Sequence, residues 1–483
     1  MTEPPVQFAP RLRARERVVV HVDSPAARWI GALALLIAAS WLVSLLARSH
    51  HHANWHADGR LAWSLTILAA VTLIARGIFL GRPVTAAHAG AAALVVLAGF
   101  GAHILAFDVL GNFLIASSGL VLMWPTSIRP QPVELPKIWK LVNATSRDPV
   151  APFAMLDRKS YHFTPDGSAA IAYCTRLGYA VVSGDPIGDE TRFDELVADF
   201  VAMCHAHGWR VVVLGCSERR LGLWNNPEIV KQTLRAVPIG RDVVIDVPTF
   251  DMVGRRFRNL RQAVQRTHNF GITTEIVAEQ ELDDERLAEL TDVLLTSAKG
   301  SRTERGFSMI LDGALTGRYP GILLIIARDR NGRVQGFHRY ALAGGGSDVT
   351  LDVPWRRRGA PNGIDERLSV DMITAMRKAG TQRLSLAFAA FPEIFNDKER
   401  GPLRSFFYTV IHLGDSLIAL ESLYRYLRKF HALGDRRYVL LSFGQVLPLL
   451  VVLLSLEFLP RTRQLPTESA EDDQTGATVS ASE

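Results

Sequence analysis

The chain has 483 residues, of which 48% are hydrophobic and 21% are charged, and its formal net charge is +6. This balance excludes a wholly disordered, collagen-like or coiled-coil protein, and the length allows about three domains. A mean hydropathy of +0.12 is high for a soluble protein, which indicates that part of the chain lies in lipid. The three cysteines form no CxxC pair, so neither a disulfide framework nor a zinc cluster is expected.

Apolar residues dominate the N-terminal part of the chain. Residues 29–47 and 61–80 each supply about the 20 apolar residues that one membrane span needs. Residues 84–124 are apolar except near Asp108, which predicts a hairpin of two helices turning there. We therefore expect a four-helix transmembrane module over 29–125.

Basic residues predict the orientation of this module. The N-terminal segment 1–28 is rich in arginine and more Lys and Arg follow the fourth span, whereas the opposite loops hold few basic residues. The positive-inside rule therefore places both ends in the cytosol, as in a multi-pass protein of the cell membrane. Histidines at 50–52 and 56 lie in the first loop without a carboxylate or cysteine ligand set, so no metal site is predicted.

After a Pro-rich linker over 126–149, hydrophobic periodicity predicts two α/β halves of similar element order, 150–250 and 271–460. The elements expected in the first half are strands at 169–174, 179–183 and 210–214 and a helix at 194–207. Those expected in the second half are strands at 322–327, 334–341, 348–353 and 383–387 and a helix at 365–379. The repeated order suggests a tandem duplication.

Three further segments complete the expected organisation. A basic helix over 251–270 connects the two halves. Residues 439–459 are apolar but interrupted by glycine, glutamine and proline, so a strand followed by a docked or interfacial helix is favoured over a fifth span. The acidic tail over 461–483 is expected to be disordered.

The connecting helix carries a stripe of arginines. Arg255, Arg258 and Arg266 fall near one face at helical spacing, and Arg261 lies beside them. Guanidinium groups bind phosphate oxygens bidentately, so the stripe is a candidate polyanion-binding surface. The alternative is an ordinary solvated face, although no acidic residue lies between Arg255 and Asn269 to balance the charge.

Two loops are also candidates for ligand contacts. Residues 356–363 form a basic loop between a strand and a helix, where Asn362 and Gly363 could offer backbone N–H groups to a phosphate or a polarised oxygen. Residues 183–189, with Asp185 among them, follow a strand and by composition form a tight turn.

Four side chains of the second half are candidates for one cleft, Arg339 as a cleft residue and the other three as catalytic residues. Glu304, His338, Arg339 and Asp352 would meet in one cleft if the strands pair as expected. Asp352 would be a carboxylate base and His338 a second proton carrier. The chain has no GxSxG, HExxH or GxxxxGK[ST] pattern, which argues against a serine hydrolase, a zincin and a P-loop enzyme, and no cofactor is predicted.

The ordered set of motifs resembles the synthase domain of the phosphatidylglycerol lysyltransferase (lysylphosphatidylglycerol synthase) family, in its actinobacterial form. The motifs are SGDPIGD at 183–189, the basic segment 254–266, ERGFSM at 304–309, LD at 351–352, APNG at 360–363, LSLAFAAF at 384–391, and ESLY, KF and RY within 421–438. Each is weak alone, but together they follow the family's order.

The resemblance implies a tandem N-acetyltransferase-like (GNAT-like) α/β fold and a membrane-bound aminoacyltransferase. Such an enzyme takes an aminoacyl group, lysyl in this family, from aminoacyl-tRNA and passes it to phosphatidylglycerol. Asp352 or His338 would accept the proton, Arg356 would steady the oxyanion, and the arginine stripe would grip the tRNA acceptor end. The family's strand-end pattern is Asp-x-x-Arg, but here Trp355 stands in place of that Arg, and Arg356 is one step further along the strand, where its side chain is expected on the opposite face.

Two alternatives therefore stay open. One is an acyltransferase of the same fold that uses acyl-CoA. The other is a catalytically idle relative that binds tRNA or anionic lipid, for which Trp355 is the main support.

Overall fold

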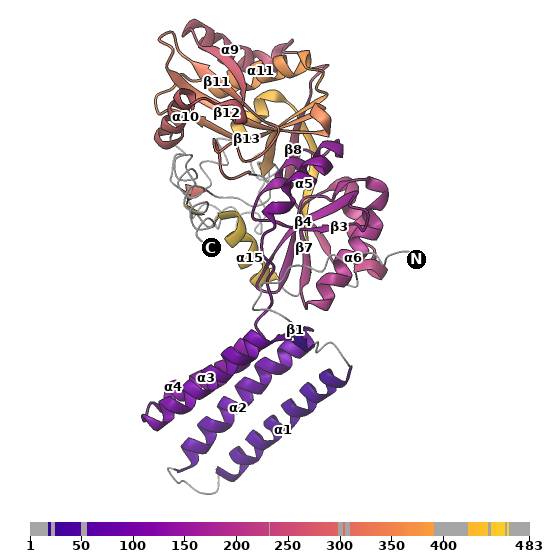
Figure 1. Cartoon of the computed structure of the whole chain (residues 1–483), viewed down its shortest axis with the longest axis vertical. Coiled ribbons are helices and arrows are strands. Elements are labelled where there is room, and N and C mark those ends of the chain that lie inside the picture. The colour runs from indigo at the N-terminus through magenta and orange to yellow at the C-terminus, as the bar shows by residue number, and fades with distance from the viewer. Residues whose placement is uncertain are drawn as a thin grey trace, which may run out of the picture. The chain divides into compact units, whose positions relative to one another are not determined.

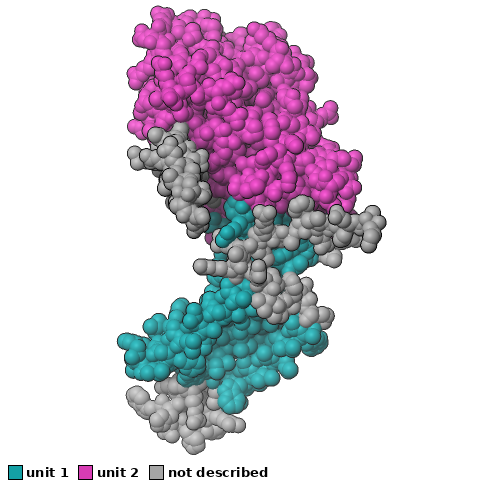
Figure 2. Space-filling model, in the orientation of Figure 1, with its two compact units in different colours: residues 1–130, 173–181, 198–211 teal, residues 131–172, 182–197, 212–483 magenta. Residues whose placement is uncertain are grey.

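The computed structural model describes residues 18–20, 25–49, 56–230, 232–297, 303–304, 310–390, 424–442, 446–458 and 461–462. The chain divides into two compact units (Figure 2). Unit 1 comprises residues 1–130, 173–181 and 198–211, and unit 2 comprises residues 131–172, 182–197 and 212–483. The Asp352 region and the cavity described below both lie within unit 2.

The N-terminal part of unit 1 is helical, as predicted (Figure 1). Its helices are α1 (Pro25–Ser49), α2 (His56–Phe79), α3 (Ala86–Ile104) and α4 (Asp108–Leu122), and a short strand pair joins β1 (Val18–Val20) to β2 (Val84–Thr85). Within α1, α2 and α3, the segments Ala26–Ser44, Leu61–Phe79 and Ala86–Ile104 are long and apolar enough to cross a membrane, whereas α4 is shorter. The hairpin turns just before Asp108, which confirms the predicted turn.

Two glycines allow α3 and α4 to pack closely. A Cβ atom added at Gly99 would lie 2.7 Å from Cγ1 of Ile115, and one added at Gly111 would lie 2.9 Å from the carbonyl oxygen of Gly99. Small residues at a helix contact are typical of membrane helices, where close packing rather than water exclusion drives association. Large apolar side chains on these helices, such as Trp29 and Leu94, point outward and are more than half exposed, as lipid-facing residues would be.

A 12-stranded mixed sheet forms the α/β part of the chain. Its strands, in spatial order, are β3 (Ser160–Phe163), β4 (Ala169–Arg176), β5 (Tyr179–Ser183), β7 (Arg210–Ser217), β15 (Leu433–Leu441), β8 (Arg235–Asp246), β14 (Arg383–Ala390), β13 (Asp348–Arg356), β12 (Val334–Ala343), β11 (Ile322–Arg328) and β9 (Thr273–Ala278), with β6 (Ile187–Gly188) paired to β4. Separately, β10 (Thr303–Glu304) pairs with β16 (Arg461–Thr462). The C-terminal strand β15 therefore lies between β7 of the first half and β8.

The helices that accompany the sheet are α5 (Leu135–Ala144), α6 (Phe193–Ala206), α7 (Leu221–Trp224), α8 (Pro227–Val230), α9 (Arg258–Asn269), α10 (Asp284–Thr296), α11 (Ile364–Lys378) and α15 (Val446–Phe458). In the second half, α9 and α11 cover one face of the sheet and α10 covers the other (Figure 1). Tyr340 and Leu351 belong to the core under α9 and α11, whereas Phe337 and Trp355 belong to the core under α10. Each face is thus sealed by its own apolar cluster.

The predicted strands and helices of both halves are present, with bounds that differ by a few residues. The 12-residue strand β8 and the strands β3 and β9 were not predicted. Helix α5 lies inside the segment predicted as a linker, and α15 follows β15 as expected for a strand and helix at the C-terminal end. Beyond Arg461 and Thr462, the predicted tail lies outside the described residues, and the boundaries of the two halves stay predictions.

Candidate functional site

Asp352 lies in a buried ion-paired group with Arg339 and Glu279. The Arg339 guanidinium is 2.8 Å from a carboxylate oxygen of Asp352 and 2.8 Å from one of Glu279, and all three side chains are fully buried. The other Asp352 oxygen accepts a hydrogen bond of 2.8 Å from the backbone N–H of Leu311. Burial raises the pKa of the Asp352 carboxyl to about 6, although Arg339 and the Leu311 N–H act in the opposite direction.

A β-bulge aims Asp352 toward Arg339. Arg339 is opposite Val353 and Tyr340 is opposite Leu351, so Asp352 has no partner across the β12–β13 ladder. Such an extra residue re-aims the side chains that follow it. As a result Leu351 packs under α9 and α11, whereas Val353 packs under α10.

His338 and Arg356 meet on the other face of the sheet. Nε2 of His338 lies 3.2 Å from Oδ1 of Asp365, and Nη1 of Arg356 lies 3.3 Å from Oδ2 of the same residue. Because His338 and Arg339 are neighbours on one strand, their side chains point to opposite faces. Of the four side chains expected to meet in one cleft, Arg339 and Asp352 therefore lie together, whereas His338 lies in a separate group around Asp365.

The remaining catalytic candidates are placed as follows. Glu304 lies on β10, where its backbone pairs with Arg461, and the adjoining residues 305–309 lie outside the described part of the chain. Trp355 is buried in the apolar cluster under α10, with its ring centroid 5.0 Å from that of Phe337. The position where the family pattern has arginine is therefore a core position here.

Gly363 fixes the start of α11 against α9. It is the residue that caps α11, with a φ of 103°, and an added Cβ would lie 2.6 Å from the carbonyl oxygen of Ala263. Glycine is required there for both reasons. Asn362 beside it is exposed, and Asp365 lies in the first turn of α11, where a carboxylate is stabilised by the helix dipole.

The arginine stripe is solvent-exposed along α9 and the turn before it. The opposite face of α9 buries Leu260, Ala263, Val264 and Thr267. Among the described residues, Arg255, Arg258 and Arg266 form no ion pair with a carboxylate. Arg261 differs, since it donates hydrogen bonds to the backbone carbonyls of Met252 and Gly254 and so ties down the chain before the helix.

Asp185 belongs to a second buried group, centred on Arg437. Arg437 is 2.7 Å from Asp148, 2.8 Å from Asp242 and 3.6 Å from Asp185. Burial, with the neighbouring Asp148, raises the pKa of Asp185, and burial raises the pKa of Asp242 to about 6. Two motifs of the resemblance, SGDPIGD and RY, thus meet in space.

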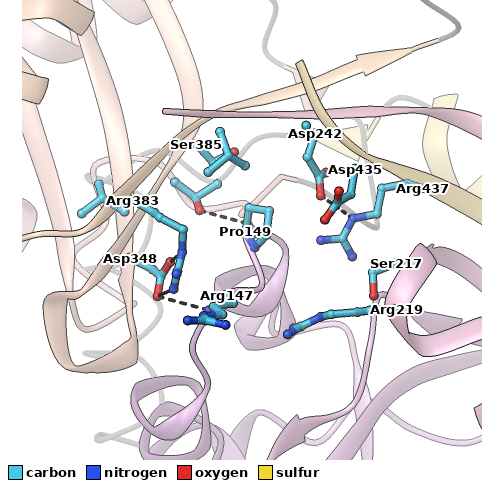
Figure 3. Close-up of a pocket in the computed structure, with 14 residues that line it drawn as sticks. Arg147, Pro149, Ser217, Arg219, Asp242, Asp348, Arg383, Ser385, Asp435 and Arg437 are labelled. Carbon is cyan, nitrogen blue, oxygen red and sulfur yellow. Dashed lines mark hydrogen bonds and ion pairs between the residues drawn. The ribbon is translucent and has the colours of Figure 1, made fainter. Parts of the chain in front are cut away.

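A cavity of about 250 Å³ adjoins this group (Figure 3). Its lining comes from the ends of several strands and from the segment after α5, and includes Arg147, Ser217, Arg219, Asp348 and Arg383. Arg383 forms two contacts with Asp348, of 2.6 and 2.8 Å. Among the described residues, no group of three or more His, Cys, Asp and Glu side chains is placed to hold a metal ion.

Sequence reasoning missed Glu279, Asp365, Asp148 and Asp242, which complete these charged groups. Asp365 carried a detectable signal, because acidic residues are favoured in the first turn of a helix. The other three lie far in sequence from the arginines that they contact, so no local pattern marks them.

Comparison with known sequences decides the family. The sequence profile described as "Phosphatidylglycerol lysyltransferase, C-terminal" matches residues 139–441. The chain belongs to this family. An MprF-like domain protein of Mycobacterium tuberculosis (strain ATCC 25618 / H37Rv) is 68% identical over 462 residues, which cover 96% of each chain.

Other family relatives are longer than this chain. The lysylphosphatidylglycerol biosynthesis bifunctional protein LysX of Rhodococcus jostii is 32% identical over 282 residues, which are 58% of this chain and 25% of that protein. Among solved structures, L-PGS from Bacillus licheniformis matches 68% of this chain and 96% of its own, with 18% identity and a TM-score of 0.57. This structural likeness confirms the expected fold of the synthase domain.

Proposed function

We propose that this protein is a membrane-bound aminoacyltransferase that moves an aminoacyl group, lysyl in the first instance, from aminoacyl-tRNA to phosphatidylglycerol. The observation that carries the proposal is the family match across residues 139–441. It is supported by N-terminal helices long and apolar enough to cross a membrane, which would hold the α/β part beside its lipid. In this proposal both ends of the helical module face the cytosol, where charged tRNA is found.

The reaction is an exchange of one ester for another. A glycerol hydroxyl of the lipid attacks the aminoacyl carbonyl, a new ester bond forms, and the bond to the tRNA ribose breaks. The proton leaves the lipid hydroxyl and ends on the ribose oxygen that departs. A group that holds this proton between the two steps needs a pKa near the working pH.

Asp352 is the proposed proton acceptor because burial brings its pKa to about 6. Its two oxygens accept hydrogen bonds from Arg339 and from the Leu311 N–H, and its side chain is fully buried, so in this proposal the surrounding chain opens before the substrate reaches it. His338, held between Asp365 and Tyr340, is the second candidate, and Arg356 on the same carboxylate would steady the oxyanion.

The arginine stripe is the proposed tRNA-binding surface. Arg255, Arg258 and Arg266 are exposed and are not paired with carboxylates among the described residues, so their charge is available to phosphates. Replacing these three by glutamate should weaken tRNA binding by at least tenfold and flatten its dependence on salt. Arg261→Ala is a poorer probe, because Arg261 supports the local backbone.

The deciding experiment is transfer of labelled amino acids from a total charged-tRNA pool to lipid, with the full-length protein in phosphatidylglycerol micelles. We expect a ribonuclease-sensitive labelled lipid, which also identifies the amino acid. Asp352→Asn should reduce the rate by 100-fold or more, on the order of what a general base contributes. If His338→Gln abolishes transfer while Asp352→Asn does not, the proton acceptor is His338. Arg333→Ala, an exposed arginine in the β11–β12 turn, is the matched control.

A second candidate function is binding without catalysis, and Trp355 favours it. The family's strand-end arginine is replaced here by a tryptophan buried in the core. Folded protein that binds tRNA or phosphatidylglycerol but yields no labelled lipid with any amino acid would support this candidate and contradict the first.

A further inference from the structure

A cluster of three arginines lies in unit 1. Arg76 belongs to the last turn of α2, Arg82 follows that helix, and Arg210 is the first residue of β7. All three belong to unit 1, together with Tyr179 of β5. None of the catalytic and tRNA-binding candidates belongs to unit 1, so the proposed transferase does not account for this cluster.

Close backbone packing places Arg82 against two turns of the sheet. A Cβ atom added at Gly208 would lie 2.8 Å from Cα of Arg82, and one added at Gly178 would lie 3.3 Å from its Nη2. The backbone N–H of Arg210 donates a hydrogen bond of 2.9 Å to the carbonyl oxygen of Gly178. Arg82 and Arg210 are therefore held beside the same turn, between β4 and β5.

The three arginines repel one another. Burial lowers the pKa of Arg82, and the charges of Arg76 and Arg210 lower it further. Burial raises the pKa of Tyr179, whereas the charges of the same three arginines act in the opposite direction, so all three lie around its phenol. Among the described residues, none of the three forms an ion pair with a carboxylate. An anion placed among them would therefore stabilise the fold.

The cluster lies at one end of the apolar helices. Arg76 is close to the end of the apolar segment Leu61–Phe79. Nη1 of Arg82 donates a hydrogen bond of 3.0 Å to the carbonyl oxygen of Met123, just after α4, and the neighbouring Trp124 is 45% exposed. An exposed tryptophan at the end of an apolar helix is typical of the interface between membrane and water. At that depth the available anions are lipid phosphates.

We propose that this arginine cluster binds the phosphate group of an anionic phospholipid, which is held as a structural ligand and is not the acceptor of the aminoacyl group. The phosphate lies among Arg76, Arg82 and Arg210, and the acyl chains lie beside the apolar helices of unit 1. Guanidinium groups recognise phosphate oxygens and negative charge. We therefore expect the site to select anionic lipids whatever the alcohol of their headgroup.

A lipid bound there would stabilise the contact between the end of the helical module and the edge of the sheet within unit 1. The indole N–H of Trp209, next to Arg210, donates a hydrogen bond of 3.0 Å to the carbonyl oxygen of Thr126. A Cβ atom added at Gly208 would lie 2.6 Å from the carbonyl oxygen of Gly81. The expected effect is a gain in stability without any reaction of the lipid, so the inference does not rest on the proposed function.

Thermal unfolding and native mass spectrometry of the full-length protein in uncharged detergent test the inference. The probes are phosphatidylinositol, phosphatidylglycerol and phosphatidylcholine. Both anionic lipids should stay bound and raise the unfolding temperature, whereas phosphatidylcholine should do neither. Arg82→Gln and Arg210→Gln should each weaken binding of phosphatidylinositol by about tenfold, as expected for loss of a charge-assisted hydrogen bond.

Two controls separate binding from folding. Arg210→Gln removes a repelling charge, so it should not lower the unfolding temperature of the lipid-free protein. Arg333→Gln, which removes an exposed arginine in unit 2, should leave lipid binding unchanged.

Three outcomes would overturn the inference. Binding that both Arg82→Gln and Arg210→Gln retain overturns the site, and phosphatidylcholine binding as tightly as phosphatidylinositol overturns the selection for charge. Binding of phosphatidylglycerol without phosphatidylinositol overturns the structural role of the lipid. Failed lipid labelling with intact binding of phosphatidylinositol would count against the proposed function only.

Discussion

Unit 2 contains two buried arginines that differ in their surroundings. Arg339 contacts two carboxylates, Glu279 and Asp352, in a group closed off by the sheet and by α10. Arg437 contacts three carboxylates, and its group borders a cavity. In each group the carboxylates outnumber the single arginine. Burying this excess negative charge costs folding free energy unless a carboxylate is protonated or another cation lies nearby. The comparison suggests that the sealed group serves positioning or proton transfer, whereas the open one can respond to a ligand.

The largest expected effect comes from removing either arginine. Arg437→Met leaves three buried carboxylates without their cation and Arg339→Met leaves two, so each should lose about 3–5 kcal/mol of stability, with the larger loss at Arg437. Thermal unfolding of the detergent-solubilised chain measures this, and limited proteolysis detects variants that fail to fold. Arg333→Met is the control. If Arg437→Met loses no more stability than Arg339→Met, the two buried groups do not differ in the way described above.

The next effect concerns the Arg339 group, which is closed off by the sheet and by α10. Trp355→Arg restores the family pattern but places a guanidinium in the apolar cluster under α10, so we expect a loss of about 3 kcal/mol or more. Leu290→Arg inserts the same group into the same cluster from α10 and should cost a similar amount. If Trp355→Arg unfolds at the wild-type temperature, the region around Arg339 accepts a second cation, and it is less sealed than the structure indicates.

A smaller effect is expected from pH. The pKa values of Asp352 and Asp242 are raised to about 6 in the folded protein, above the ordinary 3.8. Their contribution to stability is therefore fully present below pH 3.8 and is lost as the pH rises through 6, so lowering the pH from 7 to 5 should stabilise the protein by about 1 kcal/mol for each group.

Replacing each aspartate by asparagine tests which carboxyl group causes this pH dependence of stability. Asp352→Asn and Asp242→Asn should each remove part of the rise in unfolding temperature between pH 7 and pH 5. Because the pKa of Asp185 is raised as well, part of the slope should remain in both variants. A slope unchanged in both variants would show that other groups are responsible.

The smallest effect concerns two hydroxyls on the cavity wall. Thr350 donates a hydrogen bond of 2.9 Å to the carbonyl oxygen of Pro149, and the Ser217 side chain is hydrogen-bonded to Asp185. Thr350→Val and Ser217→Ala should therefore each cost about 1 kcal/mol of stability. A loss below about 0.5 kcal/mol in unfolding experiments with either variant would mean that its hydrogen bond does not stabilise the fold.

The sequence predicted the elements with clear periodicity. The strand at 179–183 and the helix ending at 379 have bounds close to those of β5 and α11 because apolar residues recur there at strand and helix spacing. Strand β8 was missed because Pro238, Gly240 and charged residues interrupt its alternation. Alternation also shows that His338 and Arg339 must face opposite ways, so their expected meeting in one cleft conflicted with the strand itself.

The charged groups could not be predicted in the same way. The direction of the Asp352 side chain depends on a bulge, which is set by the register with β12 and not by the residues of β13 alone. Arg437 lies 195 residues from Asp242 and 289 from Asp148, so only the folded topology brings them together. The resemblance marked Asp185 and the Arg437–Tyr438 motif, but not their contact.

The position of β15 between β7 and β8 has a consequence for synthesis on the ribosome. Arg437 contacts the carbonyl of Gly215 across 222 residues of chain, so β7 has no β15 partner until the C-terminal part of the protein has emerged. At about 5–20 residues per second, this interval is on the order of 10–45 s. During that time β7 presents an unpaired edge, which exposes the nascent chain to aggregation or to chaperone binding. Premature termination before β15 should therefore yield an aggregation-prone fragment and not a folded first half.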